Sequence, residues 1–182
     1  MAKLEDQVLL EKARQFDPGA LEAVYGLYSD GLYAYACRLL GDPSLAEDCV
    51  SETFSRFLQA LRRGQGPREF LKAYLYRVAH NWITDRFRHS PPEELPLEDS
   101  SVGIPDSAGD LVDAGLRAKE LRAALRRLTP EQRQAVSLRY LEGFENEEVA
   151  RAMDRPVGAA KALQQRGIAA LRRMLLREDS SP

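Results

Sequence analysis

Hydrophobic residues recur at steps of three and four along most of this chain. The clearest run follows Asp17-Pro18-Gly19 and consists of Leu21, Val24, Tyr25, Tyr28, Leu32, Tyr35, Ala36 and Leu39. This spacing predicts an amphipathic helix, with Asp17 as its N-cap and Pro18 in its first turn. The helix is expected to end at Gly41-Asp42-Pro43. No segment alternates apolar and polar residues over a length that would indicate a strand.

Two more helices are predicted in the first half of the chain. One spans about 44–61, and its apolar positions include Leu45, Cys49, Phe54, Phe57, Leu58 and Leu61. The other spans about 68–88. Residues 63–67 lie between them and contain two glycines and a proline, which continue a helix only at a cost in stability. A loop is therefore expected there.

The second half of the chain is also predicted to be helical, with helices at about 116–128, 129–141, 146–153 and 157–176. Thr129 is placed to cap its helix, and Gln132 would complete a capping box. Gly143 suits the end of that helix. A short helix, a tight turn at Asp154-Arg155-Pro156 and a longer basic helix then form a helix-turn-helix pattern.

The segment between the two halves has a different composition. Residues 90–110 contain six acidic residues, four prolines, four serines and few large hydrophobic side chains. Such a segment is typical of a linker that is extended or disordered in isolation. We therefore expect an all-α protein with two small helical domains, at 1–89 and 113–182, joined by an acidic flexible linker over 90–112.

The net charge of −2 conceals an uneven distribution. Residues 1–89 carry 12 basic and 12 acidic side chains, and residues 113–182 carry 14 and 10. Residues 90–112 carry six acidic side chains and no basic one. An acidic middle between two segments with basic surfaces favours contact of the ends, and not of the centre, with nucleic acid.

The last helix has the strongest signal for DNA. From Arg151 to Arg177 there are seven basic residues and one acidic residue. A helix fits the major groove, where glutamine can pair with adenine and arginine or lysine with guanine. The long polar residues near its start are Lys161, Gln164, Gln165 and Arg166. The residues expected to face the core are Leu163, Ile168, Leu171 and Leu175. Charge alone would equally fit a solvated cationic face, but the preceding short helix and turn favour DNA.

The helix at about 68–88 mixes aromatic and cationic residues. Residues 61–88 contain seven basic side chains against two acidic ones. Aromatic rings stack on unpaired bases and cations hold phosphates, a combination that suits single-stranded DNA. The alternative is that most of the aromatic residues belong to the core. That alternative is expected to hold for Phe70, Tyr74 and Val78, which share one face, and less so around Asn81.

Several other classes of protein have no support. No stretch is apolar enough to span a bilayer, and residues 1–10 lack the apolar core of a signal peptide, so a cytoplasmic location without direct membrane contact is expected. Cys37 and Cys49 have neither CxxC spacing nor a histidine at zinc-ligand spacing, so two reduced thiols, no metal and no cofactor are expected. No P-loop, G-x-S-x-G or HExxH motif occurs, and a lone His80 is usually structural, so an enzyme is not expected.

Two stretches resemble a known family. The stretch from Tyr33 to Arg88 is similar to region two of the extracytoplasmic-function sigma factors, and its matching motifs are LYAYACRLLGDPSLAEDCVSETF and REFLKAYLYRVAHNWITDRFR. The stretch from Leu121 to Leu176 resembles their region four, and it begins LRAALRRLTPEQRQAVSLRYLEGFENEEVARAMDRPVGAAKALQQRG. The two stretches occur in the family's order, with the family's linker between them.

The resemblance implies a sigma factor that binds bacterial RNA polymerase core and directs it to promoter DNA. Region two would grip a coiled coil on the polymerase clamp through Asp48, Ser51, Glu52, Thr53 and Arg56. It would also melt the minus-ten promoter element and capture a flipped base, through Arg63, Gln65, Arg68, Tyr76, Arg77, Asn81 and Trp82. Region four would bind the minus-thirty-five element as duplex through Arg155, Lys161, Gln164, Gln165 and Arg166. The resemblance also implies an anti-sigma factor as a third partner.

The chain departs from the family's usual pattern at several places, including Tyr74, where tryptophan is common, and Ser51, where glutamine is frequent. Gly158 is followed by Ala-Ala-Lys-Ala-Leu, where the family often has Thr-Val-Lys-Ser-Arg, so analogy does not predict the promoter sequence. The family's usual serine N-cap before the short helix is Glu145 here, with Asn146 as the alternative cap.

One competing interpretation is an autonomous helix-turn-helix regulator that never contacts polymerase. It would account for the second half of the chain, but it leaves the aromatic-basic helix and the acidic linker unexplained. Dependence on core polymerase would distinguish the two interpretations.

Overall fold

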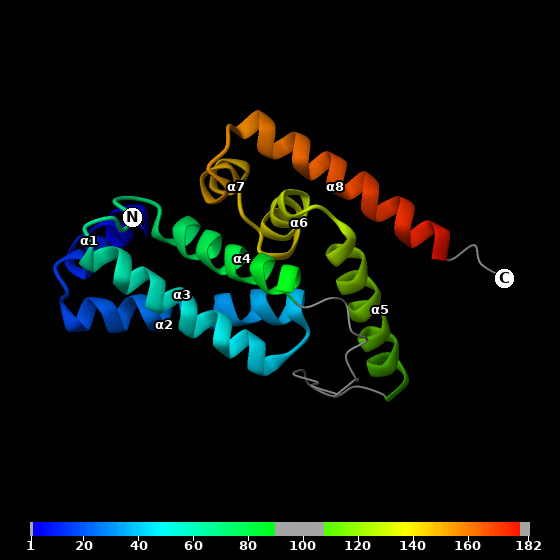
Figure 1. Cartoon of the computed structure of the whole chain (residues 1–182), viewed down its shortest axis with the longest axis horizontal. Coiled ribbons are helices and arrows are strands. Elements are labelled where there is room, and N and C mark those ends of the chain that lie inside the picture. Colours follow the sequence, from blue (N-terminus) through cyan, green and yellow to red (C-terminus); the bar gives the residue numbers. More distant parts are fainter. Residues whose placement is uncertain (1, 90–107, 179–182) are drawn as a thin grey trace.

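The computed structural model describes residues 2–89 and 108–178, and the regular elements over those ranges are all helical (Figure 1). The N-terminal half consists of α1 (Ala2–Arg14), α2 (Pro18–Leu40), α3 (Pro43–Arg62) and α4 (Leu71–His89). The C-terminal half consists of α5 (Ala108–Arg127), α6 (Pro130–Val136), the π-helical turn η1 (Ser137–Leu141), α7 (Asn146–Met153) and α8 (Val157–Glu178). The predicted all-α fold class is confirmed.

Local caps set most of the helix ends that the sequence predicts. The Asp17 carboxylate accepts the backbone N–H of Ala20 at 2.8 Å at the start of α2. Asp42 does the same for two N–H groups at the start of α3. Between these helices Gly41 adopts φ 72°, which a residue with a Cβ rarely adopts. At the start of α6 the predicted capping box between Thr129 and Gln132 is present.

The first helix of the C-terminal half begins inside the segment that was predicted to be a linker. Helix α5 begins at Ala108, so the last five positions of the predicted linker over 90–112 are helical, while residues 90–107 lie outside the described ranges. The prediction followed the acidic run that ends at Asp110. Acidic charge does not prevent a helix, and Leu111 and Val112 are compatible with one. The boundaries of the two domains otherwise stay a prediction.

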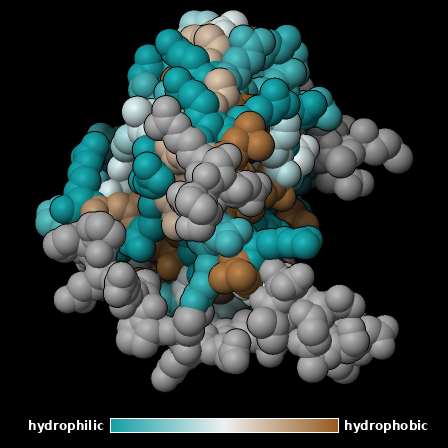
Figure 2. Space-filling model, turned by 90° about the vertical axis from the view of Figure 1, so that its right-hand side faces the viewer, coloured by the Kyte–Doolittle hydropathy of each residue, from teal (hydrophilic) through white to brown (hydrophobic). Residues whose placement is uncertain are grey.

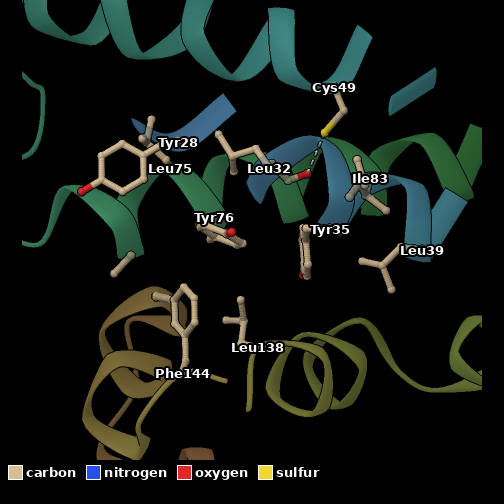
Figure 3. Packing of buried hydrophobic residues seen from close by; sticks show 14 of the residues in the cluster. Tyr28, Leu32, Tyr35, Leu39, Cys49, Leu75, Tyr76, Ile83, Leu138 and Phe144 are labelled. Carbon is tan, nitrogen blue, oxygen red and sulfur yellow. Dashed lines mark hydrogen bonds between the residues drawn. The ribbon is translucent and has the colours of Figure 1, made fainter. Parts of the chain in front are cut away.

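The two halves share one continuous hydrophobic core. Helices α2, α3 and α4 pack on one another, and α6, α7 and α8 form the second group. The groups meet where α4 packs on α7 and α2 packs on α5. Figure 3 shows this meeting point, where Tyr35 and Tyr76 face Leu138 and Phe144. The Cys49 thiol donates to the carbonyl oxygen of Ala79 across 3.8 Å, and this hydrogen bond links α3 to α4. Figure 3 marks it with a dashed line from Cys49.

The buried face of α4 differs from the predicted one. Phe70 is 38% exposed, and Tyr74 and Val78 are only half-buried. The buried positions are Leu71, Ala73, Leu75, Tyr76, Ala79, His80, Ile83 and Thr84. The prediction holds in part for Tyr74, which packs against the core, but not for Phe70, which precedes the helix with φ 54° and is exposed.

The side of the molecule on which α5 lies is shown in Figure 2, where hydrophobic side chains reach the surface among mostly hydrophilic ones. Leu116 and Leu121 are exposed large hydrophobic residues of α5. Among the described residues, no helix combines the length and the apolar character that crossing a membrane requires.

Candidate nucleic-acid and polymerase interface

Helices α7 and α8 form the predicted helix-turn-helix. Asp154 ends α7 with φ 53°, which turns the chain sharply, and the carbonyl oxygen of Pro156 accepts the N–H of Ala160 at 3.0 Å in the first turn of α8. At the other end of α7 the N-cap is Glu145, not Asn146, and its N–H donates to the Glu148 carboxylate at 2.8 Å. The N-cap therefore lies at the position where the family usually has serine, and here that position is a glutamate.

The predicted recognition residues of α8 fall on two faces. Lys161, Gln165 and Arg166 are exposed, as direct contact with DNA requires. Gln164 is only 5% exposed, and its Nε2 has no hydrogen-bond partner among the described residues. The prediction of a DNA contact at Gln164 does not fit this structure, because position 164 belongs to the buried face of α8.

The register of α8 explains where Gln164 lies. The buried positions of this helix are Ala160, Leu163, Gln164, Gly167 and Leu171, which follow the three- and four-residue spacing of one helical face. A Cβ added at Gly167 would lie 2.6 Å from Val136 Cγ2, so α8 and α6 approach closely there. The periodicity of Ala160, Leu163 and Leu171 was the signal that could have placed Gln164 inside.

The cationic surface extends beyond the predicted residues. Arg155, in the turn, is exposed and forms an ion pair with Glu131 at the start of α6. Arg172 and Arg173 are exposed further along α8. They were counted in the basic run but not assigned to the DNA surface, and exposed arginines on a DNA-binding helix would suit phosphate contacts.

The predicted base-capturing residues lie on the loop before α4 and on α4 itself. Arg63, Gln65 and Arg68 are all exposed on the loop. Arg77 and Asn81 are one helical turn apart on α4, where Arg77 is half-buried over the Tyr74 ring at 5.7 Å and Asn81 is exposed. Trp82 is half-buried. The structure therefore leaves these side chains accessible to different degrees.

The predicted polymerase-binding residues lie on α3. Asp48 and Ser51 are exposed, and Glu52 and Arg56 form an ion pair one turn apart, with 2.7 Å between Oε1 and Nε. Thr53 is 0% exposed, and its Oγ1 donates to the Cys49 carbonyl at 2.7 Å. Direct contact of Thr53 with a partner therefore does not fit the structure, because this position faces the α4 side of α3.

Tyr76 lies at the junction of the two halves. It is 4% exposed, and its ring centroid is 4.9 Å from that of Phe144 and 5.3 Å from that of Tyr35. Its hydroxyl donates to Glu142 at 3.3 Å, and Glu142 also pairs with Arg38. The predicted contact of Tyr76 with DNA is therefore blocked in this arrangement by residues from the C-terminal half.

Charged groups surround this junction. Burial raises the pKa of Glu142, and the neighbouring Arg38 opposes that shift. Burial, reinforced by Glu142, raises the pKa of Tyr76. The Lys72 ammonium lies 4.2 Å from the centre of the Phe144 ring, and the Arg151 guanidinium lies 3.9 Å from that of Phe70.

His80 also connects the two halves. The Pro130 carbonyl can only accept, so Nε2 of His80 carries the proton and donates across 3.1 Å. Nδ1 then accepts from the Tyr35 hydroxyl at 2.7 Å. Burial, reinforced by the charge of Arg133, lowers the pKa of His80 to about 3. The imidazole is thus neutral and structural, with no free nitrogen for catalysis.

Comparisons with known proteins agree with this organisation. Family models described as Sigma-70 region 2 and Sigma-70, region 4 match residues 24–90 and 118–171. The chain is 34% identical over 173 residues to the ECF RNA polymerase sigma factor BldN of Streptomyces coelicolor, covering 92% of this chain and 64% of BldN. It thus spans slightly less than two thirds of that relative's length.

A second relative is matched over most of its length. The chain is 30% identical to the ECF RNA polymerase sigma factor SigL of Mycobacterium tuberculosis, over 84% of this chain and 86% of SigL. The solved structure of CnrH in complex with the cytosolic domain of CnrY has a similar fold, with a TM-score of 0.70 and 20% identity over 97% of this chain and 99% of CnrH. The chain therefore belongs to the extracytoplasmic-function group of the sigma-70 family, the RNA polymerase sigma factors that direct transcription to promoters.

Proposed function

We propose that this chain directs bacterial RNA polymerase core to a specific set of promoters by dividing DNA recognition between its two halves. The C-terminal half binds the minus-thirty-five element as duplex, through Lys161, Gln165 and Arg166 on α8 and Arg155 in the turn. The observation that carries the proposal is that α8 exposes these cationic and amide side chains in a helix-turn-helix, while its apolar side faces the core.

The N-terminal half melts the minus-ten element and holds its bases. An exposed loop with two arginines precedes a helix that presents Arg77, Asn81 and part of Trp82. Cations beside aromatic rings suit the phosphates and faces of unpaired bases. The opposite side of this half, at Asp48, Ser51, Glu52 and Arg56 on α3, binds the polymerase clamp. Catalysis belongs to the polymerase, and the protein acts in the cytoplasm.

The two DNA-reading surfaces must separate for this function. Elements named for positions 35 and 10 lie about 25 base pairs apart, or about 85 Å along straight duplex. A compact chain of this length has a radius of gyration of about 16 Å and is about 40 Å across. Separation would also uncover Tyr76 for the minus-ten element.

The compact arrangement suits a regulated protein. CnrH was solved with the cytosolic domain of a second protein, CnrY, bound to it. We propose a comparable partner for this chain, an anti-sigma factor that binds it when the halves are together and keeps them from separating on polymerase.

The decisive experiment is run-off transcription with purified bacterial core polymerase and a genomic fragment library, with and without this protein. We expect transcripts from a defined set of promoters only when the protein is present. The variant Lys161→Ala should yield fewer of these transcripts, while Lys12→Ala, which removes an exposed cation of α1, should match the wild type. Absence of transcripts and of co-elution with core, where a known sigma factor works, would refute the proposal and favour an autonomous DNA-binding regulator.

A further inference from the structure

The loop between α3 and α4 is held from outside by α1. Its residues 63–70 carry the exposed side chains assigned above to base capture. Three consecutive backbone carbonyls of the loop accept hydrogen bonds from two side chains of α1. Arg14 Nη1 donates to the carbonyls of Gly66 at 3.5 Å and Pro67 at 3.0 Å, and Gln7 Nε2 donates to the carbonyl of Arg68 at 3.2 Å.

The loop has little structure of its own to fix this conformation. Gly64 adopts φ 69°, and Pro67 has no N–H to donate. The first part of the loop is tied back to the end of α3, where Gln65 N–H donates to the Ala60 carbonyl at 2.9 Å. Beyond that point the backbone hydrogen bonds that residues 66–68 make with described residues come from α1, while Gly66 also packs closely against Leu61 of α3. The stretch between two exposed arginines, Arg63 and Arg68, is thus positioned by a different helix.

Helix α1 is itself held in place by packing against the core. Leu10 and Ala13 are 2% and 0% exposed and anchor α1 against α2. Arg14 follows directly on Ala13, so its backbone is fixed by the core. Both hydrogen bonds of Arg14 to the loop come from one guanidinium nitrogen, Nη1, whose two N–H groups are fixed in the plane of the guanidinium. Glu11 lies 3.9 Å from Arg14 Nε on the other side and helps to orient it.

We propose that Arg14 is a positioning residue for the base-capturing loop and that Gln7 supports it, so that α1 sets the selectivity for the captured base without touching DNA. This inference rests on the proposed role of the loop in the minus-ten element. Loss of the Arg14 contacts would let residues 66–68 sample other conformations. Arg63, Gln65 and Arg68 would then contact DNA less selectively. The charges of Arg63 and Arg68, and with them the affinity for phosphate, would remain.

The test uses the full-length protein bound to core polymerase. Promoters recovered with the wild-type protein define the minus-ten bases, and a panel with each base substituted in turn measures discrimination as a ratio of transcription rates. We expect Arg14→Ala to reduce discrimination at the captured base roughly tenfold, and Gln7→Ala to reduce it less. Arg14→Lys keeps a cationic donor on a shorter side chain whose ammonium rotates freely, so it should recover part of the discrimination. Binding to minus-thirty-five duplex should not change.

Lys12→Ala is the matched control, because it removes an exposed cation from the same helix and should discriminate as the wild type does. Circular dichroism melting checks that each variant is folded. If Arg14→Ala unfolds, Gln7→Ala decides the outcome, since Gln7 is exposed and its removal disturbs only the Arg68 carbonyl. If Arg14→Ala is folded and retains full discrimination, the inference about α1 is overturned, while the proposed function stands. Where Arg14→Ala does not fold, the same result with Gln7→Ala has the same meaning. A wild-type protein without polymerase-dependent transcription would instead overturn the proposed function.

Discussion

The buried histidine at the junction makes the stability of the protein depend on pH in a predictable direction. His80 is 2% exposed and has a pKa of about 3 in the folded protein, against a value near 6.5 in an unfolded chain. Between these values the unfolded chain binds a proton that the folded chain does not. The contribution of His80 is therefore complete above about pH 6.5 and is lost as the pH falls toward 3.

The size of the effect follows from the same two pKa values. Each pH unit between them corresponds to about 1.4 kcal/mol in the free energy of unfolding. Lowering the pH from 7 to 5 should therefore remove about 2 kcal/mol through His80 alone, a large share of the stability of a small protein. In His80→Gln the amide can accept from Tyr35 and donate to Pro130, but it does not titrate. That variant should lack this part of the pH dependence.

Urea unfolding at pH 7 and pH 5, followed by helical circular dichroism, measures the difference. The comparison between wild type and variant cancels other titrating groups, including Glu142, whose raised pKa makes acid stabilising. His89→Gln is the control, because His89 is the other histidine of the chain and is exposed at the end of the same helix. A pH dependence of His80→Gln within about 0.5 kcal/mol of the wild-type value would refute the argument.

Four further predictions concern the C-terminal half. Lys161→Ala should weaken binding to duplex DNA and reduce the slope of log affinity against log salt by about 1, measured by fluorescence anisotropy over a salt series. Gln164→Met should leave that slope unchanged and raise the free energy of unfolding by about 1 kcal/mol, because it removes a buried amide nitrogen, Nε2, that has no hydrogen-bond partner among the described residues; a weaker DNA affinity would contradict the buried assignment. Gly167→Ala should destabilise by about 1 kcal/mol in urea unfolding, since its Cβ would crowd Val136 by more than helix propensity offsets. Thr129→Ala should lose the capping bond and about 1 kcal/mol, measured the same way, with Thr129→Ser close to wild type.

The sequence predicted the elements that depend on local chemistry. Asp17, Thr129 and Gly143 mark their turns through capping bonds and positive φ angles, which involve only neighbouring residues. The helix-turn-helix was predictable for the same reason. The motifs of regions two and four identified the family before any geometry was known, and the helices lie where those motifs place them.

The wrongly predicted binding residues are those whose position on the helix face was not taken into account. Gln164 was assigned to the DNA surface as a long polar residue near the start of its helix, and Thr53 was assigned to the polymerase surface through the family resemblance. Both lie on the inner faces of their helices. Counting from the neighbouring apolar positions would have placed Gln164 inside. Tyr76 is a different case, because its burial depends on Phe144 and Glu142 from the other half of the chain. No pattern within region two predicts a contact with residues 66 to 68 positions away.

The composition of the junction explains how a well-packed interface can still separate. Its apolar centre consists of Tyr35 and Tyr76 against Leu138 and Phe144. Around it lie the ion pair of Glu142 with Arg38 and the hydrogen bond of His80 to the Pro130 carbonyl. Each of these polar groups regains water when the halves part, so opening exchanges hydrogen bonds and does not only expose apolar surface. The interface therefore holds the free chain together, and binding to polymerase needs to offset a smaller penalty than an apolar core of equal size would impose.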